Sequence, residues 1–255
     1  QPEDKIKLVE TDLSLDEIAL ECEKVFNTKQ SDNLDLLFQM GGSSGGARPK
    51  IFYKMDGKEW IVKFPSSYDG KDIGKQEYLY SICAKKCGIE MPETRLLHSE
   101  LNSGYFAVER FDRQENQKVH MVSVSGILET SHRIPNLDYN ILMRLTMKLT
   151  EDYEEIEKIY RQMCFNVFAH NRDDHSKNFS YIYKNNRWHL SPAYDLTYSN
   201  SIGGEHATTV NGNGRNPQMK DILAVAAQIK LNPKKAKTIA TDIQEIVNEE
   251  LKEYI

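Results

Sequence analysis

The stretch that decides the fold is Phe165–Ser199, which reads FNVFAHNRDDHSKNFSYIYKNNRWHLSPAYDLTYS. It begins with the apolar end of a predicted helix and passes into a dense polar loop at residues 170–178. Two short alternating segments follow with a turn between them, and one further acid, Asp195, comes after the second segment. Charged side chains this dense do not build a core, so the loop either lies idle in solvent or gathers around a charged ligand.

Two spacings favour a charged ligand. Asp173 and Asn178 are five residues apart, which is the separation in the H-R-D-x-x-x-x-N catalytic loop of kinases. Asp195 follows a hairpin-sized gap, where kinases carry the metal-binding Asp of D-F-G. Phosphoryl transfer needs a carboxylate that accepts a hydroxyl proton and oxygen ligands that hold Mg²⁺ on the phosphates. We therefore predict that Asp173 is the base and that Asn178 and Asp195 are the magnesium ligands.

These residues belong to longer blocks that resemble the HipA family of serine/threonine kinases, the toxins of HipBA-type toxin–antitoxin pairs. The blocks are RDDHSKNFS at 172–180 and PAYD at 192–195, and further likeness is found in GGARPK at 45–50 and VERFDR at 108–113. The resemblance therefore covers most of the chain. It implies a two-lobed, protein-kinase-like α+β fold that uses ATP and Mg²⁺. We expect a small β-rich N-lobe in residues 1–112 and a larger helical C-lobe in residues 113–255.

A Gly-rich segment, GGSSGG at 41–46, precedes two predicted strands at 51–55 and 60–64. Glycines let backbone N–H groups approach phosphate oxygens closely, which favours a nucleotide-phosphate loop. Composition alone would equally suit a flexible linker. The order of loop, strand and strand with a lysine is typical of a kinase N-lobe, and it favours the phosphate interpretation.

The resemblance assigns the Gly-rich segment two roles. Ser43, Ser44, Gly45 and Gly46 would cover the nucleotide phosphates. Family members also phosphorylate a serine in this loop, and the matching position here is Ser43, with Ser44 one step away. A phosphate there would carry a charge of about −1.5 to −2 and would repel ATP, so self-inhibition is physically sensible.

Lys63 lies in an Ile-Val-Lys segment that resembles the V-A-I-K lysine of kinases, which pairs with the α- and β-phosphates. Glu77 lies on a predicted helix at 73–87 and is the candidate partner of Lys63, as the αC glutamate is in kinases. The alternatives are ordinary: a strand lysine and a helix glutamate that each face solvent.

Four further residues are assigned to the nucleotide by resemblance. Glu109 and Phe111 match the connection between lobes, whose backbone hydrogen-bonds adenine in the family, and His175 and Lys177 lie in the polar loop. The neighbouring pair Asp112-Arg113 has a second interpretation as a structural ion pair.

The second half of the chain reads as mainly helical. Amphipathic helices are predicted at 137–149 and 152–170, with two more at 217–229 and from 233 to about 251. The Gly- and Asn-rich segment 201–216 suits either a mobile activation segment or an unremarkable surface loop.

Composition limits the class of protein. The net charge of −5 argues against direct nucleic-acid binding by the whole chain, and no apolar run reaches the length of a membrane span. Four cysteines without zinc-site spacing are expected to be reduced thiols in a cytoplasmic protein. The chain starts with Gln1 and its Gly-rich loop lies close to that start, so we expect a kinase core without the family's N-terminal subdomain.

The resemblance also implies partners. We expect a protein substrate, for which aminoacyl-tRNA synthetases are the best-known class in the family, and a HipB-like antitoxin. Within enzymes, the rival is a small-molecule kinase of the aminoglycoside type, which shares the Asp–Asn–Asp set. A rival of another class is a metal-dependent hydrolase built on His170, His175, His189 and Asp173. A pseudokinase would be expected to lack one of the key residues, and none is missing.

Overall fold

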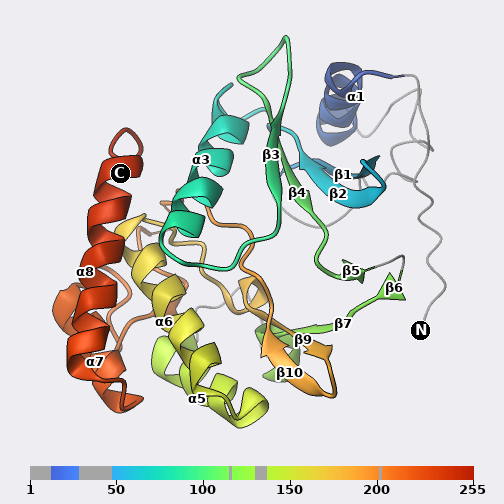
Figure 1. The fold of residues 1–255 in the computed structure, drawn as a ribbon. Coiled ribbons are helices and arrows are strands. Elements are labelled where there is room, and N and C mark those ends of the chain that lie inside the picture. Colours follow the sequence, from blue (N-terminus) through green and yellow to red (C-terminus); the bar gives the residue numbers. More distant parts are fainter. Residues whose placement is uncertain (1–12, 29–47, 115–116, 130–136, 201–202) are drawn as a thin grey trace. The chain divides into compact units, whose positions relative to one another are not determined.

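The computed structural model describes residues 13–28, 48–114, 117–129, 137–200 and 203–255 (Figure 1). The chain divides into two compact units. The first comprises residues 1–78 and 93–110, and the second comprises residues 79–92 and 111–255. The sequence-based division after residue 112 stays a prediction. Within the described residues, no helix has the length and apolar character needed to cross a bilayer.

The first unit is built on a four-stranded antiparallel sheet in the order β1-β2-β4-β3. The strands are β1 (Lys50–Met55), β2 (Lys58–Lys63), β3 (Thr94–Leu97) and β4 (Tyr105–Glu109). Asp56 and Gly57 join β1 to β2 with φ values of 54° and 75°. Positive φ at both turn residues is what a two-residue hairpin of matching twist requires, and Asp-Gly is a preferred pair there.

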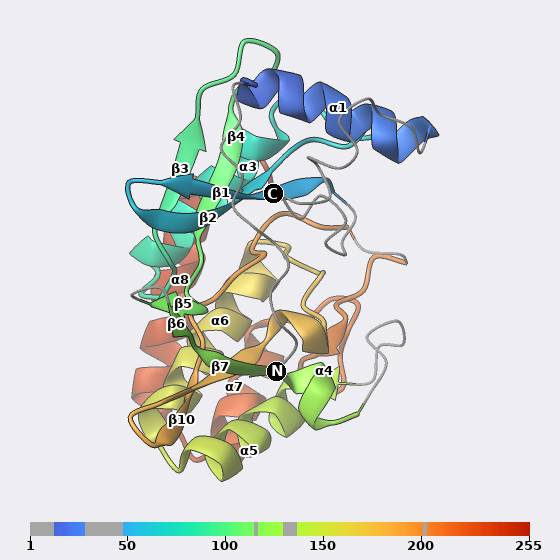
Figure 2. The same cartoon turned by 90° about the vertical axis from the view of Figure 1, so that its right-hand side faces the viewer.

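One helix, α1 (Leu15–Thr28), packs on this sheet. It begins with a capping box, in which Ser14 and Glu17 exchange hydrogen bonds, as the sequence pattern predicts. Ile18 and Cys22 on its apolar face are buried with Trp60 and other side chains of the sheet. Figure 2 shows α1 lying across the end of the sheet.

The second unit is mainly helical (Figure 1). Its long helices are α5 (Tyr139–Thr150), α6 (Tyr153–Phe168), α7 (Met219–Gln228) and α8 (Pro233–Glu250). Helix α3 (Ile73–Lys86) begins in the first unit and ends in the second. The α6 helix packs against both α5 and α8. Because α6 is central, its residues are buried on most sides, including Ile159, Tyr160 and Met163 at 0% exposure. The helix that delivers the polar loop is therefore firmly anchored.

The strands of the second unit are short. A three-stranded sheet has the order β10-β9-β7, from Arg187–Leu190, Ser180–Lys184 and His120–Ser123. The predicted hairpin turn is present, and Asn185 and Asn186 take φ values of 52° and 61°. Smaller elements complete the unit: β5 (Arg113–Gln114), β6 (Gln117–Lys118), α4 (Val124–Ile127), β8 (Leu137–Asp138), η1 (Ser176–Asn178) and β11 (Thr208–Thr209).

The Gly- and Asn-rich segment after Asp195 is folded onto the second unit where it is described. Its strand β11 pairs in parallel with β8, and Thr209 donates a 2.6 Å hydrogen bond to Asp138, the N-cap residue of α5. The four cysteines are all buried and free. Burial raises the pKa of Cys22 to about 11, so this thiol stays protonated at neutral pH.

Gly74 provides a test of the packing in the first unit. A Cβ there would lie 2.2 Å from the backbone oxygen of Gly104, whereas a Cβ at Gly70 meets nothing within 4 Å. Helix propensity alone would make Gly74→Ala stabilising. We expect instead a loss of about 1–3 kcal/mol of unfolding free energy, because backbone must move to admit the methyl group. Urea denaturation of Gly74→Ala beside Gly70→Ala measures this, and equal stability of the two variants would contradict it.

Candidate active site

The polar loop begins where α6 ends. Ala169 closes the helix with a backbone bond to Phe165, and the hydroxyl of Tyr80 donates to its carbonyl at 2.9 Å. His170 follows with a φ of 52°, a left-handed conformation that His adopts more readily than most residues. Helix continuation is impossible at such a residue, so the chain turns here into the loop.

Asp174 is the buried anchor of the loop, at 1% exposure. Its carboxylate accepts hydrogen bonds from the hydroxyl of Tyr139 at 2.9 Å and from the backbone N–H of Thr208 at 3.1 Å. Nδ1 of His206 lies 3.0 Å from the same carboxylate. The hydroxyl of Thr208 donates to the backbone oxygen of Asp174 at 2.5 Å. A buried carboxylate needs this many partners, because its desolvation is otherwise costly.

Two asparagines extend the anchor towards the helix. Asn166 donates from Nδ2 to the hydroxyl of Tyr139, and Asn171 donates from Nδ2 to Oδ1 of Asn166, both at 2.9 Å. Burial, and then the charge of Asp174, raise the pKa of Tyr139 well above its usual value. Tyr139 therefore remains a protonated donor to Asp174 at any ordinary pH. The network joins α5, α6, the loop and β11 into one hydrogen-bonded unit.

The three residues predicted to carry the chemistry lie around this anchored loop. Asn178 donates from Nδ2 to the backbone oxygen of Asp173 at 2.7 Å, which leaves its amide oxygen as a ligand atom. The Asp173 carboxylate contacts Nε2 of His175. Asp195 has a φ of 54°, and its neighbour Tyr194 donates to the backbone oxygen of Lys177 at 2.8 Å. The Tyr194 bond ties the segment that carries Asp195 to the loop that carries Asn178.

The charges of these groups act on one another. Burial is the main cause that raises the pKa of Asp173 above its usual value; His175 and Lys177 oppose the shift, and Asp195 and Asp174 add to it. The negative charges of Asp195 and Asp174 disfavour ionisation of Asp173, and a cation bound at this site would act in the opposite direction.

The donor set fits Mg²⁺ in the manner of phosphate-binding sites. Within the described residues, no group of three or more His, Cys, Asp or Glu is placed to hold an ion. Magnesium at kinase sites is held by one or two protein oxygens, and phosphate oxygens and water complete its shell. The carboxylate of Asp195 and the amide oxygen of Asn178 are hard oxygen ligands of that kind.

In the first unit, Lys63 and Glu77 form the predicted ion pair, with Nζ 2.5 Å from Oε1. The side chains are 14% and 4% exposed, so neither is the solvent-facing residue that the ordinary alternative supposed. The ring of Phe106 lies 5.5 Å from the same ammonium group. A charge pair buried this deeply holds the lysine in one position.

Glu109 and Phe111, the two residues predicted to contact adenine, differ in whether their backbone N–H group is already hydrogen-bonded. The backbone N–H of Glu109 donates to the oxygen of Glu93 at 2.9 Å, and its carboxylate accepts from Lys58 at 2.7 Å. The backbone N–H of Phe111 has no acceptor among the described residues, and its ring lies 5.8 Å from that of Tyr194. Of the two residues, Phe111 is therefore the one with a backbone donor to spare.

Other sequence-based candidates have different outcomes. Ser43, Ser44, Gly45 and Gly46 lie outside the described residues. Asp112 and Arg113 form an ion pair at 2.7 Å. The hydrolase set is not gathered, because Nδ1 of His189 lies 3.5 Å from the carboxylate of Glu155 rather than beside Asp173.

Comparison with known proteins agrees with this geometry. The model of the HipA-like C-terminal domain family matches residues 42–251 of the chain. The chain belongs to this family. The match spans residues 42–46 of the Gly-rich segment, the Lys63–Glu77 pair, the polar loop and Asp195.

Two curated relatives of this HipA-like domain are named as kinases. "Putative kinase Y4dM" of Sinorhizobium fredii is 30% identical over 200 residues, which cover 70% of this chain and 48% of that protein. A "Putative kinase" of Haemophilus influenzae is 26% identical over 181 residues, covering 62% of this chain and 53% of that protein. The HipA-like chain thus spans about half the length of the curated relatives it matches.

Solved structures show that the fold is kinase-like. HipA in the complex of the Shewanella oneidensis toxin–antitoxin system with HipB and operator DNA matches with a TM-score of 0.64 and 18% identity. That match covers 82% of this chain and 57% of the HipA chain. The proinflammatory kinase CtkA of Helicobacter pylori matches with a TM-score of 0.53 and 14% identity, covering 80% and 90%. The expected mixed α/β kinase-like fold is confirmed.

Sequence reasoning missed the buried anchor of the loop. Asp174 follows directly after the predicted base, and nothing in its local sequence separates a buried acid from an exposed one. Its partners Tyr139, His206 and Thr208 lie 32 to 35 residues away.

Thr208 and Thr197 provide a matched test of the anchor. Thr208→Val removes the donor to the backbone oxygen of Asp174 and leaves that buried group short of a partner, which costs about 1–3 kcal/mol. The buried hydroxyl of Thr197 has no partner among the described residues, so Thr197→Val should be neutral or stabilising. Guanidinium denaturation gives both values. If Thr208→Val is no less stable than Thr197→Val, the anchor contributes nothing.

Proposed function

We propose that this chain is the catalytic core of an ATP-dependent serine/threonine protein kinase of the HipA type. The observation that carries the proposal is the arrangement of Asp173, Asn178 and Asp195 on one anchored loop and the segment tied to it. The Lys63–Glu77 pair, the family and the kinase names of the relatives support it.

Each residue has a definite part in the proposed reaction. Asp173 accepts the proton of the attacking hydroxyl as the oxygen–phosphorus bond forms, and ADP leaves with the bonding electrons. Asn178 and Asp195 supply the oxygen ligands for Mg²⁺, which neutralises charge on the phosphates. Lys63, held by Glu77, binds the α- and β-phosphates. His175 and Lys177 lower the pKa of Asp173 and so favour its basic form at neutral pH.

The remaining parts of the proposal concern partners and control. The acceptor is a serine or threonine hydroxyl of a cellular protein, for which an aminoacyl-tRNA synthetase is the candidate class. Ser43 in the Gly-rich loop is the proposed site of autophosphorylation. A HipB-like antitoxin is the proposed binding partner, since the HipA of the similar structure is in complex with HipB.

Transfer of labelled phosphate tests the proposal. With γ-labelled ATP, Mg²⁺ and cell lysate, the wild-type chain should label protein serine or threonine residues, including Ser43. Asp173→Asn should lower the rate by roughly 10²–10⁴-fold, the usual contribution of a general base, while ATP binding persists. Asp242→Asn removes the same charge from an exposed position on α8 and should change nothing. Equal labelling by wild type and Asp173→Asn would contradict the assigned base.

The rate should also depend on pH through Asp173. Because its pKa is raised, the activity should fall on acidification at a pH above the usual pKa of an aspartate. Lys177 opposes that raised pKa, so Lys177→Gln should move the acid limb of kcat to still higher pH. The measurement is kcat against pH at saturating ATP. An acid limb that moves to lower pH in Lys177→Gln would show that another group controls it.

A further inference from the structure

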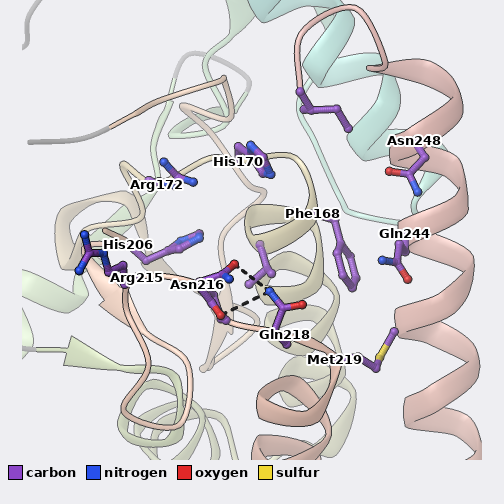
Figure 3. A pocket seen from close by; sticks show the side chains of 13 residues that line it. Phe168, His170, Arg172, His206, Arg215, Asn216, Gln218, Met219, Gln244 and Asn248 are labelled. Carbon is purple, nitrogen blue, oxygen red and sulfur yellow. Dashed lines mark hydrogen bonds between the residues drawn. The ribbon is translucent and has the colours of Figure 1, made fainter. Parts of the chain in front are cut away.

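The second unit contains a cavity of about 430 Å³ that the proposed reaction does not use. Figure 3 shows it between the end of α6, the segment before α7, and the C-terminal half of α8. Its floor is apolar and its walls carry amides and cationic groups. The lining residues are Val167, Phe168, His170, Arg172, His206, Arg215, Asn216, Pro217, Gln218, Met219, Gln244, Asn248 and Ile255.

Among the described residues of the lining, the charged side chains are all basic. In Figure 3, His170 and Arg172 from the loop after α6 lie on the same side of the hollow as His206 and Arg215 from the segment before α7. No described residue of the lining is an aspartate or a glutamate. Nδ1 of His206 lies 3.0 Å from the carboxylate of Asp174, which is not part of the lining.

The two guanidinium groups are not neutralised by described residues. Arg172 donates to the amide oxygen of Asn200 at 3.0 Å, and no carboxylate pairs with it. Arg215 is exposed and has no hydrogen bond or ion pair within the described part of the chain. Guanidinium groups without a carboxylate partner have a strong affinity for planar or tetrahedral oxyanions.

The pKa of His170 is lowered partly by the positive charge of its neighbours. Burial is the largest cause that lowers the pKa of its imidazole, and the charges of Arg172 and His206 lower the pKa further. Arg172 and His206 thus add positive potential at a position where burial already disfavours the charged imidazole of His170. An anion in the cavity would offset that potential.

Helix dipoles do not account for the cluster. Cations stabilise the C-terminal end of a helix, which suits His170 just after α6. Arg215, however, comes shortly before the N-terminal end of α7, where a positive charge is unfavourable. Interaction with helix dipoles therefore accounts for the position of His170 but not for that of Arg215.

We propose that this cavity binds a dianionic phosphate group, carried either by a phosphorylated side chain or by a small phosphate. Arg172 and Arg215 pair with its oxygens, and the amides of Gln218, Gln244 and Asn248 line the space that remains. Arg172 directly precedes Asp173, and its backbone oxygen accepts from Ala207 at 3.1 Å. Occupancy is thereby coupled to the polar loop. The binding site itself stands whether or not the chain transfers phosphate.

Calorimetry with inorganic phosphate and with a phosphothreonine peptide, beside its unphosphorylated form, tests the proposal. Arg215→Gln should weaken binding of the phosphorylated probe by about tenfold or more, as expected for a charge-assisted bond. Arg187→Gln, an exposed arginine on β10 outside the cavity, carries the same charge change and should leave binding unaltered. Tighter binding of the peptide than of phosphate would identify a phosphoprotein ligand, and equal binding would identify a small phosphate.

Nuclear magnetic resonance locates the bound anion. Saturation with phosphate should raise the pKa of His170. The resonances of the exposed His120 on β7 should not change when phosphate is added. The proposal is wrong if no probe binds saturably at millimolar concentration, if Arg187→Gln weakens binding as much as Arg215→Gln, or if the pKa of His170 does not move.

Discussion

The burial of the Asp174 carboxylate is the constraint on which the functional loop depends. A carboxylate removed from water is tolerated only when its oxygens are fully bonded, and here the donors come from α5, from β11 and from His206. The bonds fix the backbone of the loop on both sides of Asp173. A loop that carries six ionisable or amide side chains in sequence therefore takes one conformation instead of many.

Held this way, the loop presents the charged side chains that the proposed phosphate transfer would use. Asp173 stays half-exposed, while its neighbour Asp174 is buried. Adjacent acids thus serve opposite purposes because one faces the solvent side of the loop and the other faces the core. The Tyr194 bond ties the segment that carries Asp195 to the same loop, and Asp195 itself has a left-handed backbone. The basic cavity beyond Arg172 gives the same loop a second surface that favours anions.

Local sequence patterns predicted much of the fold: apolar spacing predicted α6, and Asn185-Asn186 predicted the hairpin. Resemblance to kinases predicted the ion pair between Lys63 and Glu77, which the structure contains. The roles of Asp173, Asn178 and Asp195 stay predictions. The buried hydrogen bonds of Asp174 were not predicted, because bonds between residues more than thirty positions apart leave no local sequence pattern. For the same reason the cavity around Arg215 was not foreseen: its members are separated along the chain and share only their charge.

Anomalous diffraction from crystals grown with Mn²⁺ and a non-hydrolysable ATP analogue tests the central claim most directly, since it locates the ion that the loop is held to receive. The account predicts manganese bound to the carboxylate of Asp195 and the amide oxygen of Asn178, with phosphate oxygens completing the shell and Asp173 outside it. Manganese coordinated by Asp173 without Asp195, or bound away from the loop altogether, would contradict the account.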